Sequence, residues 1–206
     1  MKIVVGIPCM GTIQSMTVAS LIQQQKAYTD IEFDYYMIES SLVYDARNVI
    51  LDQVNKSDAD YLLFIDSDII FPNNALKALL DQNKSMIAGV YWNRSEIVRK
   101  PVIYDSIKPR HIFKRKAEVT PLKRKIQGCE EVKACGMGFC LIRKDLIKKI
   151  TKKFVSPFEP YKGMGEDISF CYRVGKIGEK IYALECNLEH IGTKRYKGVE
   201  SWYGSI

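Results

Sequence analysis

Apolar runs and helix-like repeats alternate along the first 95 residues of the chain. Short runs of branched and aromatic residues predict buried strands, and stretches whose apolar residues return every three or four positions predict helices. The predicted strands are Lys2–Pro8, Phe33–Ile38, Tyr61–Ile65 and Met86–Tyr91; the predicted helices are 13–28, 45–55 and one capped by Asn73 or Asn74 that runs to about residue 82. This alternation predicts an α/β fold with a mostly parallel sheet and helices on both of its faces.

The same periodicity predicts the inward face of the first two helices. The residues expected to face the sheet are Val18, Leu21 and Ile22 in the first helix, and Ala46, Val49, Ile50 and Val54 in the second. Ligands of such sheets bind beyond the carboxyl ends of the strands, so we look there for functional residues.

The second half of the chain follows a different pattern. Residues 95–128 are basic and interrupted by proline, which predicts a long loop or a pair of short strands. After them we predict a strand at Gly138–Ile142, helices at Lys144–Lys152 and Glu166–Arg173, a strand at Lys180–Glu185, and a mobile polar tail over 192–206. We therefore expect a single domain over 1–206, with 1–95 binding the nucleotide and 96–206 the acceptor.

The positive charge of the protein is concentrated in one segment. The 206 residues carry a net charge of +7, and residues 98–125 hold ten Lys or Arg against two acidic residues. That segment is therefore +8 and the rest of the chain is −1. A basic patch of this kind indicates either an anionic partner or a solvated loop that keeps the protein soluble.

The ends of the chain and its cysteines indicate the compartment. The amino terminus lacks the long apolar stretch of a signal peptide, and no run approaches the roughly 20 apolar residues of a membrane span. We therefore expect a soluble, cytoplasmic protein whose six cysteines are reduced thiols. The spacing of Cys129, Cys135 and Cys140 lacks the close pairs of structural zinc sites.

Two carboxylates follow the third predicted strand directly. Asp66 and Asp68 are two positions apart, so in an extended segment they project to the same side. Two converging carboxylates favour a hard divalent cation, which can share its other ligand positions with phosphates. The alternative is an acidic turn in which Asp68 caps the next helix.

Two further groups have candidate chemistry. Glu166 and Asp167 open a predicted helix, where carboxylates are stabilised by the helix dipole, and either could instead act as a general base. His190 follows the last predicted strand, and its imidazole could complete a metal site or be an ordinary surface side chain.

Four motifs in this order resemble the GT-A fold glycosyltransferases, especially the inverting family-two type: FIDSD, CGMGFCLIRKDL, GEDISFCYRVGKIG and EHIG. The resemblance runs from about Lys2 to Gly192 and implies a Rossmann-like fold. It implies that Asp68 binds Mn²⁺ or Mg²⁺, that Asp66 binds the metal or the ribose, and that His190 is a third metal ligand. It also implies that Asp167 is the base, with Glu166 as the second candidate.

The resemblance extends to the nucleotide-sugar itself. It places the nucleotide near Pro8 and Glu39, and the donor sugar above Gly136 and Gly138. The pair Arg47 and Asn48 precedes the metal strand and could face the nucleotide or be an exposed helix pair. Since the sequence ends soon after the histidine, we expect the acceptor to be recognised by the basic segment, the tail or a partner. Lys194, Arg195 and Lys197 could fold over the diphosphate as a lid that stabilises the leaving group.

These features predict a metal-dependent glycosyltransferase that moves a sugar from a nucleoside-diphosphate sugar to an acceptor hydroxyl, with inversion. The basic segment indicates a polyanionic acceptor such as modified DNA. Two alternatives are a nucleotidyltransferase, which usually has a basic Gly-rich loop that GIPCMGTIQ lacks, and a non-catalytic nucleic-acid-binding protein, which would leave the acidic motifs without a role.

Overall fold

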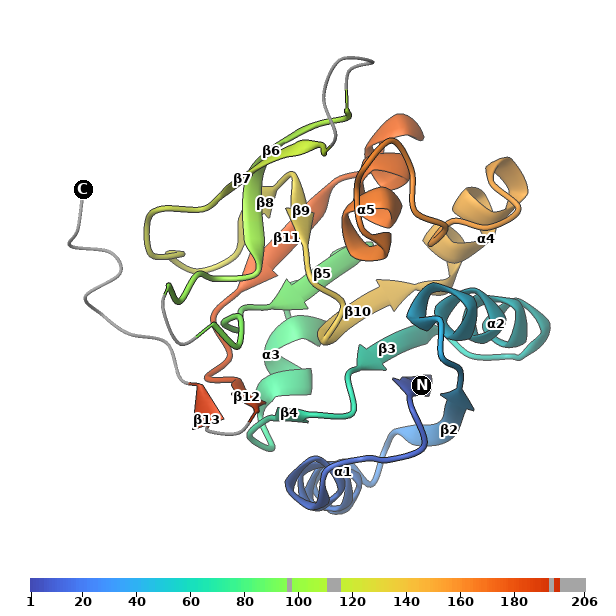
Figure 1. Cartoon of the computed structure of the whole chain (residues 1–206). Helices are drawn as coiled ribbons and strands as arrows, with labels where there is room; N and C mark the ends of the chain where they lie inside the picture. Colours follow the sequence, from blue (N-terminus) through green and yellow to red (C-terminus); the bar gives the residue numbers. More distant parts are fainter. Residues whose placement is uncertain (96–97, 111–115, 193–194, 197–206) are drawn as a thin grey trace.

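The chain forms an α/β domain built on one central sheet (Figure 1). The computed structural model describes residues 1–95, 98–110 and 116–192, and the backbone of 195–196. Within these residues, seven strands form the central sheet in the order β2-β1-β3-β10-β5-β11-β8. Their bounds are β2 Glu32–Glu39, β1 Lys2–Cys9, β3 Tyr61–Ile65, β10 Phe139–Arg143, β5 Met86–Gly89, β11 Ile181–Leu184 and β8 Glu130–Val132. The predicted α/β fold is confirmed.

The sheet is mostly parallel. The strands β2, β1, β3, β5 and β11 run in one direction, whereas β10 and β8 run antiparallel to their neighbours. The sequence predicted β10 as a strand but not its place between β3 and β5. This insertion brings the turn before β10 to the carboxyl end of β3, where the amide of Asp66 donates a 3.0 Å hydrogen bond to the carbonyl of Gly138.

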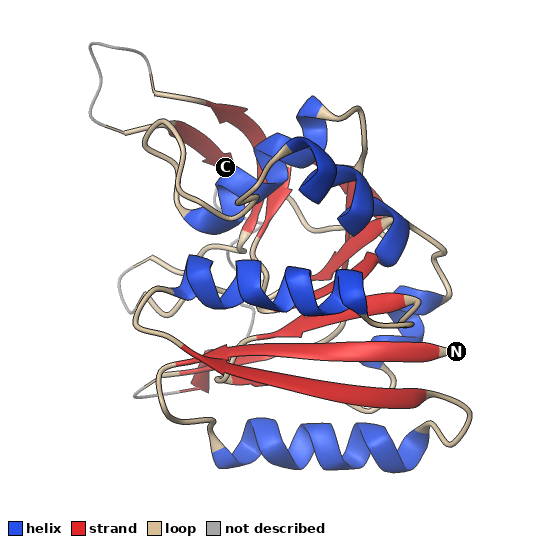
Figure 2. Cartoon of the chain, turned by 90° about the vertical axis from the view of Figure 1, so that its right-hand side faces the viewer, coloured by secondary structure: helices blue, strands red, loops and turns tan. Residues whose placement is uncertain are grey.

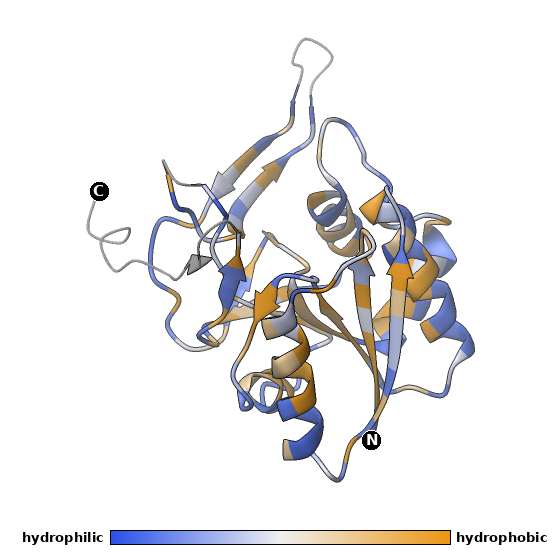
Figure 3. Cartoon of the chain, turned by 60° about the horizontal axis from the view of Figure 1, so that its bottom comes forward, coloured by the Kyte–Doolittle hydropathy of each residue, from blue (hydrophilic) through white to orange (hydrophobic). Residues whose placement is uncertain are grey.

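Helices cover both faces of this sheet (Figure 2). The core on one face is formed with α2 (Val43–Lys56), α4 (Lys144–Lys153) and α5 (Glu166–Lys176), and the core on the other face with α1 (Ser15–Ala27) and α3 (Ala75–Leu80). Hydropathy colouring shows hydrophobic residues along the inner strands and a mixed distribution on the helices (Figure 3). None of the helices in the described chain has the length and apolar character that a bilayer crossing requires.

The predicted inward face of α1 is partly wrong. Leu21 is buried, but Val18 and Ile22 are 38% and 49% exposed. The rotation of α1 is set by its contacts with the segment after β3: the amide of Gln14 donates to the carbonyl of Ser67, and the amide of Phe71 donates to the Ser20 hydroxyl. The helix therefore buries its small polar stripe and leaves two branched residues in solvent.

A similar correction applies to α2. Ala46, Ile50 and Val54 are buried as predicted, whereas Val49 is 42% exposed. The inward face includes Arg47 instead, because its guanidinium is surrounded by carboxylates that hydropathy alone does not reveal.

Two small sheets lie beside the central one. One joins β4 (Ile69–Ile70), β12 (Glu189–Ile191) and β13 (Arg195–Tyr196); the other joins β6 (Ile103–Lys108), β7 (Glu118–Pro121) and β9 (Ala134–Cys135). The basic segment thus contains a pair of short antiparallel strands, β6 and β7. Most of the predicted mobile tail, including Lys194 and Lys197, lies outside the described residues.

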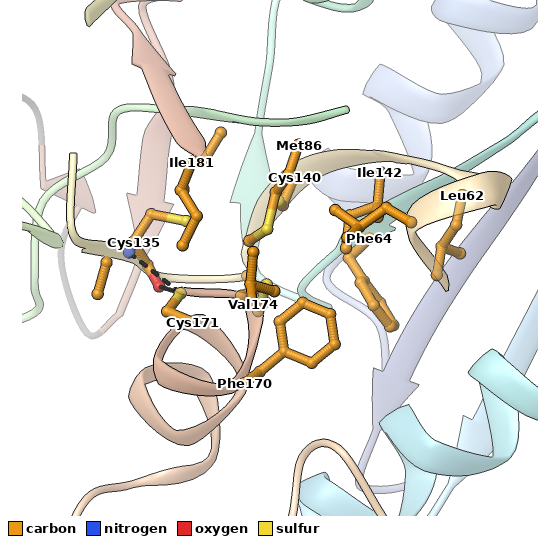
Figure 4. Close-up of a cluster of buried hydrophobic side chains, with 14 of the residues drawn as sticks. Leu62, Phe64, Met86, Cys135, Cys140, Ile142, Phe170, Cys171, Val174 and Ile181 are labelled. Carbon is orange, nitrogen blue, oxygen red and sulfur yellow. Dashed lines mark hydrogen bonds between the residues drawn. The ribbon is translucent and has the colours of Figure 1, made fainter. Parts of the chain in front are cut away.

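Four of the six cysteines, Cys135, Cys140, Cys171 and Cys186, are buried core residues, and Cys9 and Cys129 are partly exposed. All six are free thiols, and Figure 4 shows Cys135, Cys140 and Cys171 within the hydrophobic cluster under α5. Burial raises the pKa of the Cys171 thiol well above its ordinary value, which disfavours the thiolate that zinc requires.

The close contact between β1 and α2 predicts a stability effect. A Cβ added at Gly6 would lie 2.7 Å from Cγ2 of the buried Ile50, a branched side chain that cannot move aside easily. Gly6→Ala should therefore destabilise the protein by about 1–3 kcal/mol in urea unfolding. Gly175→Ala is the control: a Cβ there meets no atom within 4 Å in α5, and the variant should be up to about 1 kcal/mol more stable. Equal stabilities of the two variants would contradict this account of the packing.

Candidate active site

The two aspartates after β3 have different partners. Oδ1 of Asp66 accepts a 2.8 Å hydrogen bond from Nη2 of Arg47, whereas the carboxylate of Asp68 contacts Arg94 and His190. Both side chains are largely buried, with 25% and 16% of their surface exposed. Residues 67–68 form a turn, in which the amide of Ile69 donates to the carbonyl of Asp66 at 3.3 Å, so the expected extended segment is wrong and strand alternation does not set the directions of the two side chains. Both carboxylates follow the carboxyl end of β3, where each is held by a separate cation.

Arg47 is the centre of the site. Its side chain is 2% exposed and binds three carboxylates: Nη2 contacts Asp66, and Nη1 contacts Asp167 and, at 3.5 Å, Glu166. The guanidinium carbon also lies 5.7 Å from the ring centre of Phe158. An exposed helix pair at this position, the alternative left open by the sequence, is therefore excluded for Arg47.

Burying a guanidinium is costly unless its donors are matched by acceptors in good geometry. Here the acceptors come from the end of β3 and from the start of α5, two elements about 100 residues apart in sequence. Counting each carboxylate as −1 and Arg47 as +1, this cluster has a formal charge of −2. A cluster with that charge suits a divalent cation with oxygen ligands.

His190 faces Asp68. It lies in β12 opposite Ile69, is 8% exposed, and packs edge-on against Tyr91 at 5.3 Å between ring centres. Its Nδ1 is 2.9 Å from the carbonyl oxygen of Trp92, which can only accept, so we infer that Nδ1 carries a hydrogen. In the neutral ring, Nε2 then presents its lone pair towards Oδ1 of Asp68 at 3.4 Å. Two acceptors that face each other favour a proton or a cation between them.

The loop before β10 closes the other side of the site. A Cβ at Gly136 would lie 2.0 Å from the Tyr91 hydroxyl oxygen, and one at Gly138 would lie 2.8 Å from Cζ of Tyr91 and 3.0 Å from Oδ2 of Asp66. Only glycine fits these two positions without displacing the tyrosine. The amide of Gly138 donates to the Tyr91 hydroxyl at 3.2 Å, and burial raises the pKa of Tyr91 well above its ordinary value, so the phenol stays protonated.

This loop is also tied to the start of α5. The amide of Met137 donates a 3.3 Å hydrogen bond to Oδ2 of Asp167, whose Oδ1 binds Arg47. Both oxygens of Asp167 therefore have partners. Glu166 has one long contact with Arg47 and is 27% exposed.

The remaining candidates lie around this cluster. Pro8 is buried at the end of β1, and Glu39 is exposed at the end of the neighbouring β2. The side-chain oxygen of Asn48 accepts a 3.1 Å hydrogen bond from the amide of Phe158, which gives it a structural contact. Lys194 and the side chain of Arg195 lie outside the described residues.

The sequence did not single out Tyr91 or Arg94. Tyr91 could have been noticed as the last residue of a predicted strand, at the edge where ligands bind. Arg94 has no such signal, since only the folded chain brings it to Asp68. In the described part of the chain, no group of three or more His, Cys, Asp or Glu side chains is placed to hold a metal; Asp68 and His190 form a pair.

Comparison with known proteins supports the fold. The sequence matches no protein-family model, and no curated protein has a significantly similar sequence. The fold is similar to that of A197 from STIV, with a TM-score of 0.63, 21% identity, and coverage of 93% of this chain and 86% of A197. The nucleoside-diphosphate-sugar pyrophosphorylase from Vibrio cholerae RC9 gives a TM-score of 0.49 at 13% identity, covering 98% of both chains. The likeness to A197 supports a Rossmann-like α/β domain.

The burial of Arg47 predicts its contribution to stability. Arg47→Met should destabilise the protein by about 3–5 kcal/mol in urea unfolding, because it leaves three carboxylates without their shared cation. Lys77→Met is the control: it removes an exposed pair with Asp81 and should leave the unfolding midpoint near that of the wild type. Similar midpoints for both variants would show that the carboxylates do not depend on Arg47.

Proposed function

We propose that this chain is a metal-dependent, inverting glycosyltransferase of the GT-A type, which transfers a sugar from a nucleoside-diphosphate sugar to an acceptor hydroxyl. The observation that carries the proposal is the convergence of Asp66, Asp68 and His190 with Glu166 and Asp167 at the carboxyl end of the parallel strands. Ligands of this sheet class bind at that edge. The likeness in fold to A197 is compatible with it.

The residues around Asp68 fit a divalent ion. Asp68 and His190 offer an oxygen and a nitrogen 3.4 Å apart, and the Trp92 carbonyl orients the imidazole so that its second nitrogen faces the carboxylate. Asp66 precedes Asp68 by two residues, and its Oδ1 is held by Arg47. Bound Mn²⁺ or Mg²⁺ would neutralise the charge that develops on the leaving nucleoside diphosphate.

We propose that the general base, which removes the proton of the acceptor hydroxyl, is one of the two carboxylates at the start of α5. The family resemblance favoured Asp167, but its two oxygens already bind Arg47 and the Met137 amide. Glu166 retains an accessible oxygen, so we assign it as the general base and Asp167 as the residue that positions α5 against the loop before β10. Loss of the proton makes the hydroxyl a better nucleophile for the anomeric carbon.

The donor is assigned to the edge formed by β1, β2 and the glycine loop. Pro8 and Glu39 lie at the ends of two adjacent strands, and the lack of side chains at Gly136 and Gly138 lets Tyr91 pack directly against this loop. Because 2% of its side chain is exposed, Arg47 has a positioning role in this proposal rather than a direct contact with the nucleotide. Asn48 supports the site through Phe158.

We propose that an anionic acceptor, such as nucleic acid, binds beside the basic segment, which contains the antiparallel strands β6 and β7. The amide of Arg110 donates to the carbonyl of Lys162 at 2.9 Å, and that of Ala117 donates to the carbonyl of Gly163 at 3.3 Å. The residues that follow β6 and precede β7 are therefore joined to the loop that precedes Glu166. Cations at that position would attract phosphates close to the proposed base.

A panel of nucleotide-sugars with Mn²⁺ tests the proposal directly. We expect release of a nucleoside diphosphate from one donor, and Asp68→Ala should abolish it because the ion loses its carboxylate. Asp81→Ala, at an exposed acidic position directly after α3, is the control and should retain the activity.

Other outcomes of this assay identify the alternatives. Formation of a nucleoside triphosphate from the nucleotide-sugar and pyrophosphate would indicate a nucleotidyltransferase. No turnover of any donor, together with salt-sensitive binding of nucleic acid, would indicate a non-catalytic binding protein. Undiminished turnover in Asp68→Ala would reject the metal site.

The two carboxylates of α5 should respond differently to substitution. Glu166→Gln should lower turnover of the active donor by about 10²–10⁴-fold while leaving the urea midpoint unchanged, because it removes a base that has one weak contact. Asp167→Asn should lower the urea midpoint as well, because it breaks the link to Arg47 and Met137. A fully active Glu166→Gln beside an inactive Asp167→Asn of wild-type stability would assign the base to Asp167.

A further inference from the structure

Arg94 is the second arginine that binds a carboxylate of this site. Its Nη1 lies 2.7 Å from Oδ2 of Asp68, while Oδ1 of the same carboxylate faces His190. Arg94 follows Trp92 by two residues, so the segment that orients the imidazole also supplies a cation to the aspartate. Both oxygens of Asp68 therefore have partners: Arg94 contacts Oδ2, and His190 of β12 contacts Oδ1.

Arg94 differs from Arg47 in how firmly it is held. Arg47 is 2% exposed and binds three carboxylates between aromatic rings, whereas Arg94 is 55% exposed and makes one ion pair with a described residue. Removing Arg47 from its partners would leave a charge buried, but Arg94 can turn into solvent without that cost. Exposed ion pairs contribute little net free energy, so a stronger cation can displace this guanidinium from Asp68.

We propose that Arg94 is an exchangeable counter-cation: it neutralises Asp68 in the metal-free protein and turns to the diphosphate when a divalent ion takes that carboxylate. The inference rests on the proposed function, because it requires an ion at Asp68 and a phosphate group beside it. A diphosphate bound through an ion at Asp68 must lie next to a guanidinium that starts in contact with the same carboxylate. The planar fork of arginine donors suits phosphate oxygens.

If Arg94 exchanges in this way, its removal should change the affinities for the ion and for the nucleotide in opposite directions. Arg94 competes with the ion for Asp68, so its removal should strengthen binding of the ion alone. Arg94 also contributes hydrogen bonds to the diphosphate, so its removal should weaken binding of the nucleotide when the ion is present. A residue that only supported the local fold would weaken both, and the opposed changes therefore distinguish exchange from structural support.

The experiment measures both bindings on the full chain. Binding of Mn²⁺ alone is followed by the electron paramagnetic resonance signal of the free ion, and binding of UDP and GDP at saturating Mn²⁺ by calorimetry. For Arg94→Ala we expect Mn²⁺ to bind about two- to fivefold more tightly, which is the range of an exposed ion pair. We expect the better-bound of the two nucleotides to bind about tenfold more weakly or worse.

Two further variants complete the comparison. Arg94→Lys keeps the charge but loses the fork, so Mn²⁺ affinity should stay near the wild-type value while nucleotide affinity falls. Lys149→Ala is the matched control: Lys149, in α4, is 57% exposed and pairs with Glu179 at 2.7 Å, so its loss should change neither affinity.

The outcomes separate the inference from the proposed function. If the wild type binds no Mn²⁺, or Asp68→Ala binds it equally well, the proposed metal site fails and the exchange fails with it. If Asp68→Ala loses Mn²⁺ but Arg94→Ala binds both ligands as the wild type does, or binds both more weakly, the exchange is wrong and the proposed function stands. Tighter Mn²⁺ together with weaker nucleotide supports it.

Discussion

The buried guanidinium of Arg47 is the constraint on which the arrangement of the acidic residues depends. It lies beneath the end of β3 and the start of α5 and contacts a carboxylate from each. A cation removed from water needs such partners, and carboxylates brought together need such a cation. The position of Glu166 and Asp167 relative to Asp66 is therefore fixed by a residue from α2, a third element. The cluster keeps a formal excess of negative charge, which is the basis for proposing a divalent ion beside it.

The two arginines of the site illustrate how burial decides what a charge can do. Arg47 is surrounded by aromatic rings and carboxylates, so any movement would expose unpaired charge to a medium of low polarity. Arg94 holds Asp68 from the solvent side, where water can replace the lost partner. Arg47 is therefore suited to hold the carboxylates in place, and Arg94 is suited to the exchange that we propose. Residue type alone does not separate these roles.

The antiparallel strand β10 positions the glycine loop beside the carboxylates of the site. By entering between β3 and β5 it places Gly136 and Gly138 against Tyr91, and its preceding loop against Asp167. The glycines are required because the tyrosine fills the space that a Cβ would need. A strand of the second half of the chain thus lies in the middle of the sheet formed by the first, and the site belongs to both halves.

The sequence by itself determined the order of the longer strands and helices, the carboxylates at the end of β3 and the pair at the start of α5, because hydrophobic periodicity and strand ends are local properties. It did not predict the short strands β4, β8, β9 and β12. Only the tertiary structure decided the inward faces of α1 and α2, since helix rotation follows contacts such as that of Ser20 with Phe71. It also decided the place of β10 and the partners of Arg47, His190 and Arg94. Those contacts join residues between 19 and 122 positions apart, and their pairing depends on distances and burial that a linear pattern does not contain.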